Sequence, residues 1–269
     1  MNPKRHANPG LSEEHSGSLR DLKSAIVSHW KKASRLAVKR IAVFGAGGAT
    51  GREVLHHGVR AGFDLCAIDR TPPDEADRLA GVTYRDADVL EDDLAEVMAN
   101  CDAVISTLGV AFTPKMAVSS PPPLYTEGTR RILKAMERTG IERIAVISAA
   151  FVIDQPNLPL WFKASVVPAL HSILDQMREM ERLLEDKPRL DWTAVRPGWL
   201  IDKPASGELL VEEEFFPEQA FRCRPGDLGA FLVDCVANAR QIHRKPAVGA
   251  PEEEQFESPL ALGKAFADL

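Results

Sequence analysis

A glycine-rich segment near the start of the chain constrains the fold most. An apolar, partly β-branched run occupies residues 41–44, and glycines follow at positions 45, 48 and 51. Apolar residues then resume at helical spacing, so the segment predicts a strand, a tight turn and the start of a helix. The N–H groups at a helix start, together with the helix dipole, favour a bound phosphate. The segment therefore predicts a dinucleotide-binding turn.

Each of the three glycines has its own physical reason to be there. Gly45 allows the sharp turn out of the strand, Gly48 leaves room for a pyrophosphate, and Gly51 lets helix and strand pack closely. The alternative is that the glycines form a plain structural connector. The context favours nucleotide binding, because Asp69 and Arg70 stand at the end of the next predicted strand.

Strand and helix patterns alternate along the rest of the chain. Strands are predicted at 41–44, 65–68, 82–84, 103–108, 143–147, 191–196 and 246–248, and helices at 51–62, 91–100, 124–139, 169–184 and 227–239. Proline-rich loops are expected at 110–124 and around Trp161 and Phe162, and a loop-rich cap at 201–222. This alternation predicts an α/β fold: a doubly wound, Rossmann-type, mostly parallel sheet of six to seven strands.

The ends of the chain differ in composition from the part between them. Residues 1–38 are expected to form a disordered tail followed by a basic amphipathic helix, which either docks on the main domain or meets a membrane surface or partner. Residues 39–250 are expected to form the single Rossmann domain, and residues 251–269 an acidic tail.

Composition excludes several classes of function. The net charge of −6 and the pI of about 5.7 argue against nucleic-acid binding. No run approaches the roughly 18 apolar residues of a membrane span, and a secretory h-region is missing. The four cysteines have no C-x-x-C spacing and are expected to be reduced and mostly buried, which predicts a cytoplasmic protein. The adjacent His56 and His57 cannot share a helix face, so no metal site is expected.

The end of the second strand bears on cofactor choice. An acidic side chain such as Asp69 accepts hydrogen bonds from ribose hydroxyls and favours NAD. The neighbouring Arg70 can pair with a 2′-phosphate and favours NADP. We expect NADP(H), with Asp69 rotated outward, and NAD as the alternative.

Seven short motifs occur together and in order: Gly45-Ala-Gly-Gly-Ala-Thr-Gly51, Asp69-Arg70, Asp88-Val89, Ile105-Ser-Thr-Leu-Gly109, Thr126-Glu-Gly-Thr, Ile147-Ser-Ala-Ala-Phe151 and Leu190-Asp-Trp-Thr-Ala-Val-Arg-Pro-Gly198. With these motifs the chain resembles an atypical short-chain dehydrogenase/reductase of the NAD(P)H-binding group and is similar to biliverdin-IXβ/flavin reductase. The resemblance covers residues 39–250.

The resemblance implies a cofactor site and one candidate for chemistry. Cofactor contacts are expected at Gly45, Gly48, Ala49, Thr50, Gly51, Asp69, Arg70, Asp88, Val89, Leu108, Gly109 and Pro197. Ser148 would stand at the active-site serine, where its hydroxyl could donate to an oxygen that gains charge, with the proton coming from water.

The chain departs from the family pattern at three positions. Many of these reductases carry a Tyr-x-x-x-Lys pair, with Tyr as the proton donor, and its positions fall here on Ile173 and Met177. Arg131 replaces an asparagine that is common in the family. Flavin-reductase relatives also lack the tyrosine, so its loss does not exclude catalysis, because hydride transfer to flavin needs mainly stacking and positioning.

Three functions fit these observations. The favoured one is an NAD(P)H-dependent oxidoreductase that transfers hydride to a small-molecule acceptor, namely a flavin, quinone, tetrapyrrole or carbonyl compound. The second is a non-catalytic NAD(P)-sensing regulatory or interaction protein. The third is a structural Rossmann-like module without cofactor.

Overall fold

The computed structural model describes residues 38–110, 121–156, 158, 160–216 and 220–253 of the chain. The tail and helix expected within residues 1–37, most of the loop expected at 110–124 and most of the acidic tail lie outside the described residues. Residues 38–269 form one compact unit, and the description below concerns the described residues of that unit.

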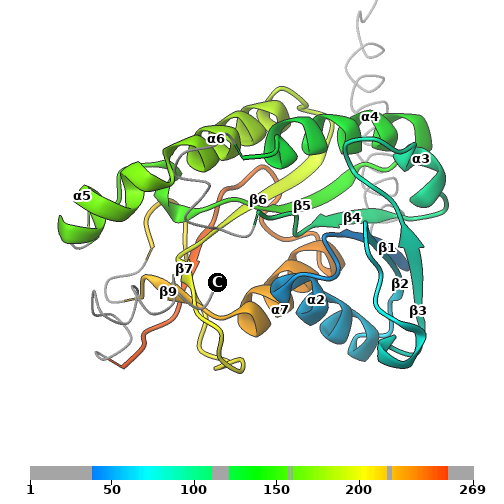
Figure 1. The fold of residues 1–269 in the computed structure, drawn as a ribbon, viewed down its shortest axis with the longest axis horizontal. Coiled ribbons are helices and arrows are strands. Elements are labelled where there is room, and N and C mark those ends of the chain that lie inside the picture. The colour runs from blue at the N-terminus through cyan, green and yellow to red at the C-terminus, as the bar shows by residue number, and fades with distance from the viewer. Residues whose placement is uncertain (1–37, 111–120, 157, 159, 217–219, 254–269) are drawn as a thin grey trace, which may run out of the picture. The chain divides into compact units, whose positions relative to one another are not determined.

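An eight-stranded sheet forms the centre of this unit, with the strand order β3-β2-β1-β4-β5-β6-β10-β8 (Figure 1). The strands are β1 Arg40–Phe44, β2 Asp64–Asp69, β3 Val82–Asp86, β4 Ala103–Ser106, β5 Arg143–Ile147, β6 Asp191–Pro197, β8 Leu210–Glu212 and β10 Ala247–Gly249. All neighbouring strands are parallel except β8, which pairs antiparallel with β10. The predicted doubly wound α/β sheet is confirmed, with one strand more than the upper estimate.

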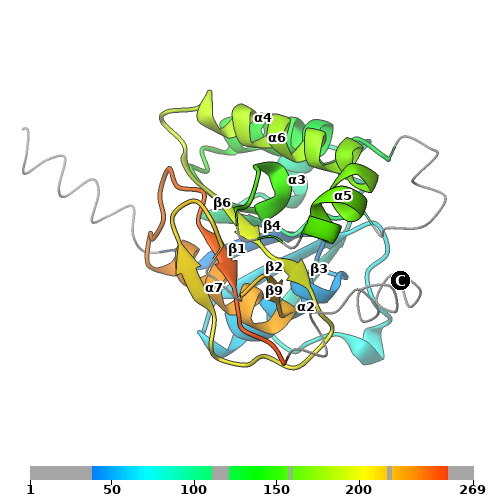
Figure 2. The same cartoon turned by 90° about the vertical axis from the view of Figure 1, so that its left-hand side faces the viewer.

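Helices cover both faces of the sheet (Figures 1 and 2). They are α2 Ala49–Arg60, α3 Leu94–Val97, α4 Thr129–Thr139, α5 Leu160–Ala169, α6 His171–Glu185 and α7 Pro225–Ala237. Side chains alternate across β1, so that Phe44 packs with the α4 and α6 side and Val43 with the α2 and α7 side. Short helical turns occupy Glu75–Asp77, Leu124–Gly128 and Ala150–Val152.

The predicted loop-rich cap at 201–222 was wrong in part. It contains β8 and the start of β9 Arg222–Cys223, which forms a separate two-stranded parallel sheet with β7 Trp199–Leu200. All three residues of β8 are exposed. Such a strand lacks the alternation of apolar and polar residues that reveals a half-buried strand.

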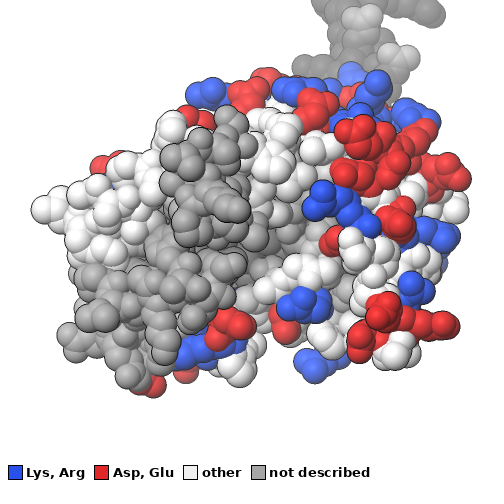
Figure 3. Space-filling view, viewed as in Figure 1, with Lys and Arg blue, Asp and Glu red and all other residues white. Residues whose placement is uncertain are grey.

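The loop expected around Trp161 and Phe162 is also a correction, because these residues lie in α5. This helix is apolar on most sides and contains Pro168, so it has no single apolar stripe that would mark it in the sequence. The left-hand end of the molecule in Figure 3, where Figure 1 places α5, is largely uncharged. The helix predicted at 169–184 is found as α6.

Two other helices differ from their predicted bounds by more than two residues at one end or both. The helix predicted at 91–100 is the single turn α3, which starts after Asp93, whose Oδ1 accepts from Ala95 N at 3.0 Å. The helix predicted at 124–139 begins with a π-helical turn, Leu124–Gly128, and continues as α4. It ends at Gly140, which has φ of 75°, as the sequence indicated.

All four cysteines are free and buried, as predicted. Within the described ranges, no helix is long and apolar enough to cross a membrane.

Candidate functional site

The turn after β1 has a geometry that requires glycine. Gly45 adopts φ of +73°, and a Cβ there would lie 2.8 Å from the carbonyl oxygen of Thr107. Gly45 N donates to Ile68 O at 3.1 Å, and Thr107 Oγ1 donates to the carbonyl oxygens of Phe44 and Gly45 at 2.9 and 3.0 Å. The turn is therefore fixed to the ends of both β2 and β4.

Gly48 and Gly51, the other two glycines of the predicted pattern, keep side chains away from the start of α2. Gly48 precedes the helix with φ of −69°, and no side chain caps the helix. A Cβ on Gly48 would lie 3.3 Å from Gly45 O, whereas a Cβ on Gly51 would collide with that same oxygen. Ala49 and Thr50 complete the first turn of α2. An uncapped helix start beside bare backbone fits a pyrophosphate, because its N–H groups need an acceptor.

Asp69 and Arg70 take opposite positions at the end of β2. Asp69 Oδ2 accepts from Gly47 N at 2.9 Å, and Oδ1 accepts from Thr71 N at 3.4 Å. The Arg70 side chain is 74% exposed and lies 3.9 Å from Asp88 Oδ2. The carboxylate thus faces the glycine turn, and the outward rotation of Asp69 expected from the sequence is not the arrangement found.

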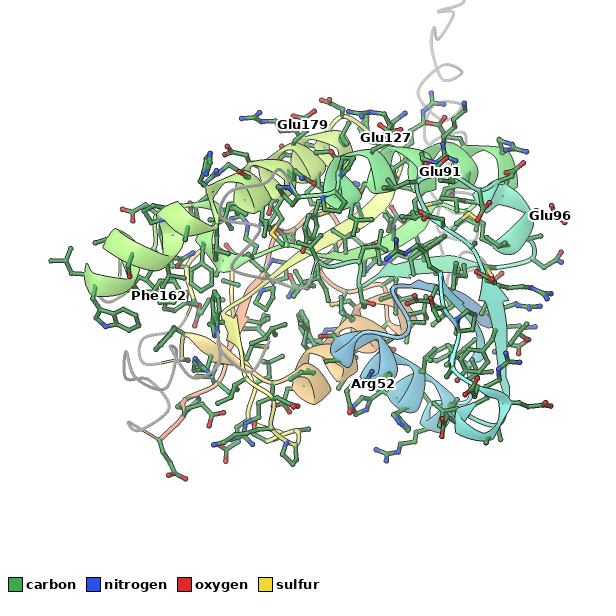
Figure 4. All side chains as sticks on the ribbon, in the orientation of Figure 1. Arg52, Glu91, Glu96, Glu127, Phe162 and Glu179 are labelled. Atoms are coloured by element: carbon green, nitrogen blue, oxygen red, sulfur yellow. The ribbon has the colours of Figure 1, made fainter. Side chains whose placement is uncertain are left out.

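Arg52 is a cation at this site that the sequence pattern did not single out. Its Nη1 donates to Gly47 O at 2.6 Å, and the side chain lies at the start of α2 (Figure 4). Gly47 thus has Asp69 on its N–H and Arg52 on its carbonyl. The one signal in the sequence is that Arg52 directly follows Gly51, the last glycine of the predicted pattern.

The segment at Asp88 and Val89 is held from α4. Arg131 Nε donates to Val89 O at 2.9 Å, and its Nη2 donates to Asp92 O at 2.8 Å. Asp88 Oδ1 accepts from Leu90 N at 2.8 Å. Arg131, at the position of the family's usual asparagine, therefore fixes the backbone of this segment through two carbonyl oxygens.

The end of β4 brings Leu108 and Gly109 to the same edge as the glycine turn. A Cβ on Gly45 would lie 3.0 Å from Leu108 N. Gly109 is exposed, and the following Val110 N donates to the phenol oxygen of Tyr125 at 3.4 Å. Tyr125 belongs to no motif recognised in the sequence, and its place at this edge depends on the π-helical turn that contains it.

Ser148 follows β5 and enters a buried charged cluster. Its Oγ donates to Glu181 Oε1 at 2.7 Å, and Ser148 is 1% exposed. Arg196 donates to both oxygens of Glu181, at 2.9 and 2.6 Å, and Lys245 Nζ lies 3.4 Å from Glu181 Oε2. Burial raises the pKa of Glu181, but the bonds from Arg196 and Ser148 outweigh it and hold the pKa below its ordinary value. The sequence pattern missed Glu181 and Arg196 as partners of Ser148.

The helix face that would carry the tyrosine and lysine of related reductases is apolar here. Ile173 and Met177 lie on α6 and are buried among core residues. Glu181 stands one helical turn beyond Met177, on the same face. In this arrangement the Ser148 hydroxyl proton is directed to Glu181 and not to a ligand.

Aromatic side chains gather after β5 and β6. Phe162 of α5 lies with its ring centre 5.0 Å from that of Phe151, 5.7 Å from that of Trp199 and 6.0 Å from that of Phe221 (Figure 4). Pro197 ends β6 and is buried. These rings form an aromatic wall beyond β5 and β6, in which Phe151, Phe162 and Phe221 are buried and Trp199 is partly exposed.

The predicted site residues share one edge of the sheet, although not all are in contact. The Asp69 carboxylate and the backbone of Leu108 lie against the glycine turn, whereas Ser148 follows β5 and Pro197 ends β6, the next two strands beyond β4. A separate hollow of about 580 Å³ lies at the opposite edge, between the end of α4 and residues 186–190. No group of three metal-ligating side chains occurs in the part of the chain that the structure describes.

Known proteins resemble this chain in sequence and fold. An uncharacterized chloroplastic protein of Arabidopsis thaliana is 26% identical over 205 residues, which are 73% of this chain and 72% of that protein. The oxidoreductase ylbE of Lactococcus lactis superposes with a TM-score of 0.64 at 18% identity, covering 84% of this chain and 97% of the other. A Streptococcus pneumoniae protein, provisionally assigned as an NADH-flavin reductase, gives a TM-score of 0.62 at 22% identity, covering 79% of this chain and 99% of the other.

The family model for NAD(P)H-binding proteins matches residues 45–239, a segment that begins at the first glycine of the turn and ends just after α7. The turn lies between β2 and β4 at the point where the strand order reverses, which is where open α/β sheets bind dinucleotides. Sequence match and geometry agree, and the chain belongs to the NAD(P)H-binding family.

Proposed function

We propose that the protein is an NAD(P)H-dependent reductase that transfers hydride to a small-molecule acceptor: a flavin, quinone, tetrapyrrole or carbonyl compound. The observation that carries this proposal is the glycine turn, in which Gly45 and Gly48 leave bare backbone before an uncapped helix at the switch point of the sheet. The likeness to the Streptococcus pneumoniae protein supports an acceptor of this kind.

In this proposal the cofactor lies along the carboxyl edge of the sheet. The pyrophosphate is held by Gly45, Gly48, Ala49, Thr50 and Gly51, the adenosine half by Asp69, Arg70, Asp88 and Val89, and the nicotinamide half by Leu108, Gly109 and Pro197. When bound, the cofactor supplies the hydride, and the side chains of this chain orient both reactants and exclude water.

The acceptor faces the aromatic wall through Trp199, the partly exposed ring of that group. Flat, delocalised acceptors suit such a wall, because stacking positions them without a charged anchor. Ser148 closes the site from β5 and acts by position, since its proton goes to Glu181 at 2.7 Å. Its lone pairs, not its O–H, are then what it offers to a ligand.

NADP(H) is the proposed cofactor. Two exposed arginines, Arg52 and Arg70, lie beside Gly47 and after Asp69 respectively. Their charge supports a 2′-phosphate at this end of the site. We also propose a cytoplasmic location, since four free buried thiols suit a reducing compartment.

The test is NAD(P)H oxidation by the full chain with a panel of flavins, quinones, biliverdin and simple carbonyl compounds. We expect steady oxidation with one or more of these acceptors, and no oxidation by a Gly48→Val variant. A second candidate, a non-catalytic NAD(P) sensor, is favoured by the apolar Ile173 and Met177. Tight cofactor binding without turnover on any acceptor would support the sensor and contradict the reductase.

A further inference from the structure

The phenol of Tyr125 lies at the carboxyl end of β4. Val110 N donates to its oxygen at 3.4 Å, and a methyl group added to Gly109 would lie 3.7 Å from that oxygen. Gly109 is exposed, whereas Tyr125 is 7% exposed. The hydroxyl therefore lies just beneath the exposed backbone of Gly109, which has no side chain to cover it.

The hydrogen bonds of Tyr125 are unbalanced. Its oxygen accepts from Val110, but among residues 38–110, 121–156, 158, 160–216 and 220–253 its own O–H meets no acceptor. Buried hydroxyl groups normally use their proton in a hydrogen bond. An acceptor atom of a ligand above Gly109 would complete the set.

The ionisation state of Tyr125 suits a donor. Burial raises the pKa of this phenol above its ordinary value, and the bond from Val110 offsets only part of that effect. The side chain is thus neutral and carries its proton throughout the physiological pH range.

The backbone that carries Tyr125 is unusual and well fixed. Residues Leu124–Gly128 form a π-helical turn, a conformation that is rare and frequent at functional sites. Gln176 of α6 donates to Pro121 O at 3.3 Å, just before that turn. The turn is thereby held against α6, and with it the direction of the Tyr125 ring.

Other candidates for a proton donor are already used or lie elsewhere. The Ser148 proton is directed to Glu181. The other tyrosine of the chain, Tyr84, belongs to β3, which two strands separate from β4 in the sheet, and its oxygen accepts from Leu79 N at 3.1 Å. Of the two tyrosines, Tyr125 is the one that the fold places at the carboxyl edge of the sheet, where open α/β sheets bind dinucleotides.

We propose that Tyr125 is the hydrogen-bond and proton donor to the acceptor, in place of the tyrosine that related reductases carry on α6. The role rests on the proposed reductase function. The acceptor gains a hydride, with its electron pair, from the reduced nicotinamide, which is oxidised. The O–H bond of Tyr125 breaks as a bond to that hydrogen forms on an oxygen or nitrogen of the acceptor, and water returns a proton to the tyrosinate.

The first test follows ligand binding by NMR and needs no turnover. The chain has two tyrosines, and each gives one resonance when tyrosine is labelled with ¹³C at Cζ. The Tyr84→Phe variant assigns them. NADP⁺ and 1,4-naphthoquinone, both oxidised and therefore unreactive together, are added to the labelled protein. We expect the Tyr125 resonance to shift and the Tyr84 resonance to stay. A Tyr125 resonance that does not move would overturn the proposal.

The second test compares Tyr125→Phe with the matched control Tyr84→Phe, using NADPH and the panel acceptor that the parent reduces fastest. We expect kcat of Tyr125→Phe to fall roughly a hundredfold, as for loss of a general acid, with its solvent isotope effect lost and its NADPH affinity unchanged. Tyr84→Phe should match the parent. An active Tyr125→Phe with the parent's kcat and isotope effect overturns the role of Tyr125 alone. A parent inactive on every acceptor overturns the reductase function and this role together.

Discussion

Ser148 Oγ and Glu181 Oε1 lie 2.7 Å apart, and the hydroxyl donates to the carboxylate. This bond joins the end of β5 to α6, and Arg196 of β6 binds the same carboxylate through two nitrogens. The residue that the family resemblance marks for chemistry is thus part of a buried ionic cluster. Ser148 should therefore act first on the stability and geometry of the carboxyl edge of the sheet, and on turnover only as a consequence.

Replacing Ser148 with alanine should separate these two effects. The variant loses a hydrogen bond to a charged group, so we expect the free energy of unfolding in urea to fall by about 1.5–3 kcal/mol. We expect kcat to fall less than tenfold, and cofactor affinity to be unchanged. Ser165→Ala, at an exposed serine of α5, is the control and should change none of these. An unchanged stability with a kcat reduced tenfold to a hundredfold would instead support a direct catalytic role.

Glu181 should make stability depend on pH in the acid range. Its folded-state pKa is held below the ordinary 4.5, chiefly by Arg196 against the opposing effect of burial. The stabilisation is therefore complete above about pH 4.5 and is lost as the pH falls through the lower folded value. Arg196, Lys245 and Ser148 face the carboxylate, and Glu185 pairs with Lys245 from the other side.

The measurement is urea unfolding of the parent and of Glu181→Gln from pH 7 to pH 3. At pH 7 the variant leaves Arg196 buried without its counter-charge, which costs about 3–5 kcal/mol. The difference between parent and variant should shrink below pH 4.5 as Glu181 itself becomes neutral. A difference that stays constant over the whole range would show that Glu181 does not titrate with unfolding.

Local patterns in the sequence predicted much of the fold. The buried strand β5 occupies the predicted residues 143–147, because a continuous apolar run between a helix stop at Gly140 and the next turn signal permits little else. Helix α5 and strand β8 were missed because neither has a periodic apolar face: one is apolar on most sides and the other exposed at every residue.

The candidate site, like the fold, was predictable where it depends on residues close together in the sequence. The glycine turn depends on residues within seven positions of one another, so its spacing is visible in the sequence. The bond between Ser148 and Glu181 joins residues 33 apart and depends on how α6 packs on the sheet. The place of Tyr125 depends on a π-helical turn, which has no periodic signature. Such pairings emerge from packing, which no single segment of sequence determines.

The glycines of the turn should respond differently to the same substitution. Gly48 has φ of −69°, which any residue adopts, and a Cβ there has a single close neighbour at 3.3 Å. We expect Gly48→Val to fold and to lose cofactor binding in calorimetry, because its side chain occupies the phosphate position. Gly51→Val, whose Cβ would collide with Gly45 O, should fail to fold or unfold at much lower urea. Equal affinity of Gly48→Val and the parent would remove the cofactor from this turn.

Cofactor choice tests the competition between Asp69 and the two arginines. Asp69 is held at the turn by Gly47 N, an arrangement that also suits ribose hydroxyls, whereas Arg70 is exposed and able to reach a 2′-phosphate. We expect the parent to bind NADPH more tightly than NADH in calorimetry. Arg70→Ala should weaken NADPH binding roughly tenfold to a hundredfold, the size of one charge-assisted hydrogen bond, and leave NADH binding unchanged.

Arg52 should contribute to the same preference. Its Nη1 is bonded to Gly47 O, and an incoming 2′-phosphate would compete for that guanidinium. Arg52→Ala should therefore weaken NADPH binding more than NADH binding, although less than Arg70→Ala does. Arg60→Ala, at the far end of α2, is the control for loss of one positive charge and should leave both affinities as they are. If the parent binds NADH as tightly as NADPH, or if neither Arg52→Ala nor Arg70→Ala changes the ratio, then the bond between Asp69 and Gly47 fixes a site for NAD and the assignment of NADP(H) is wrong.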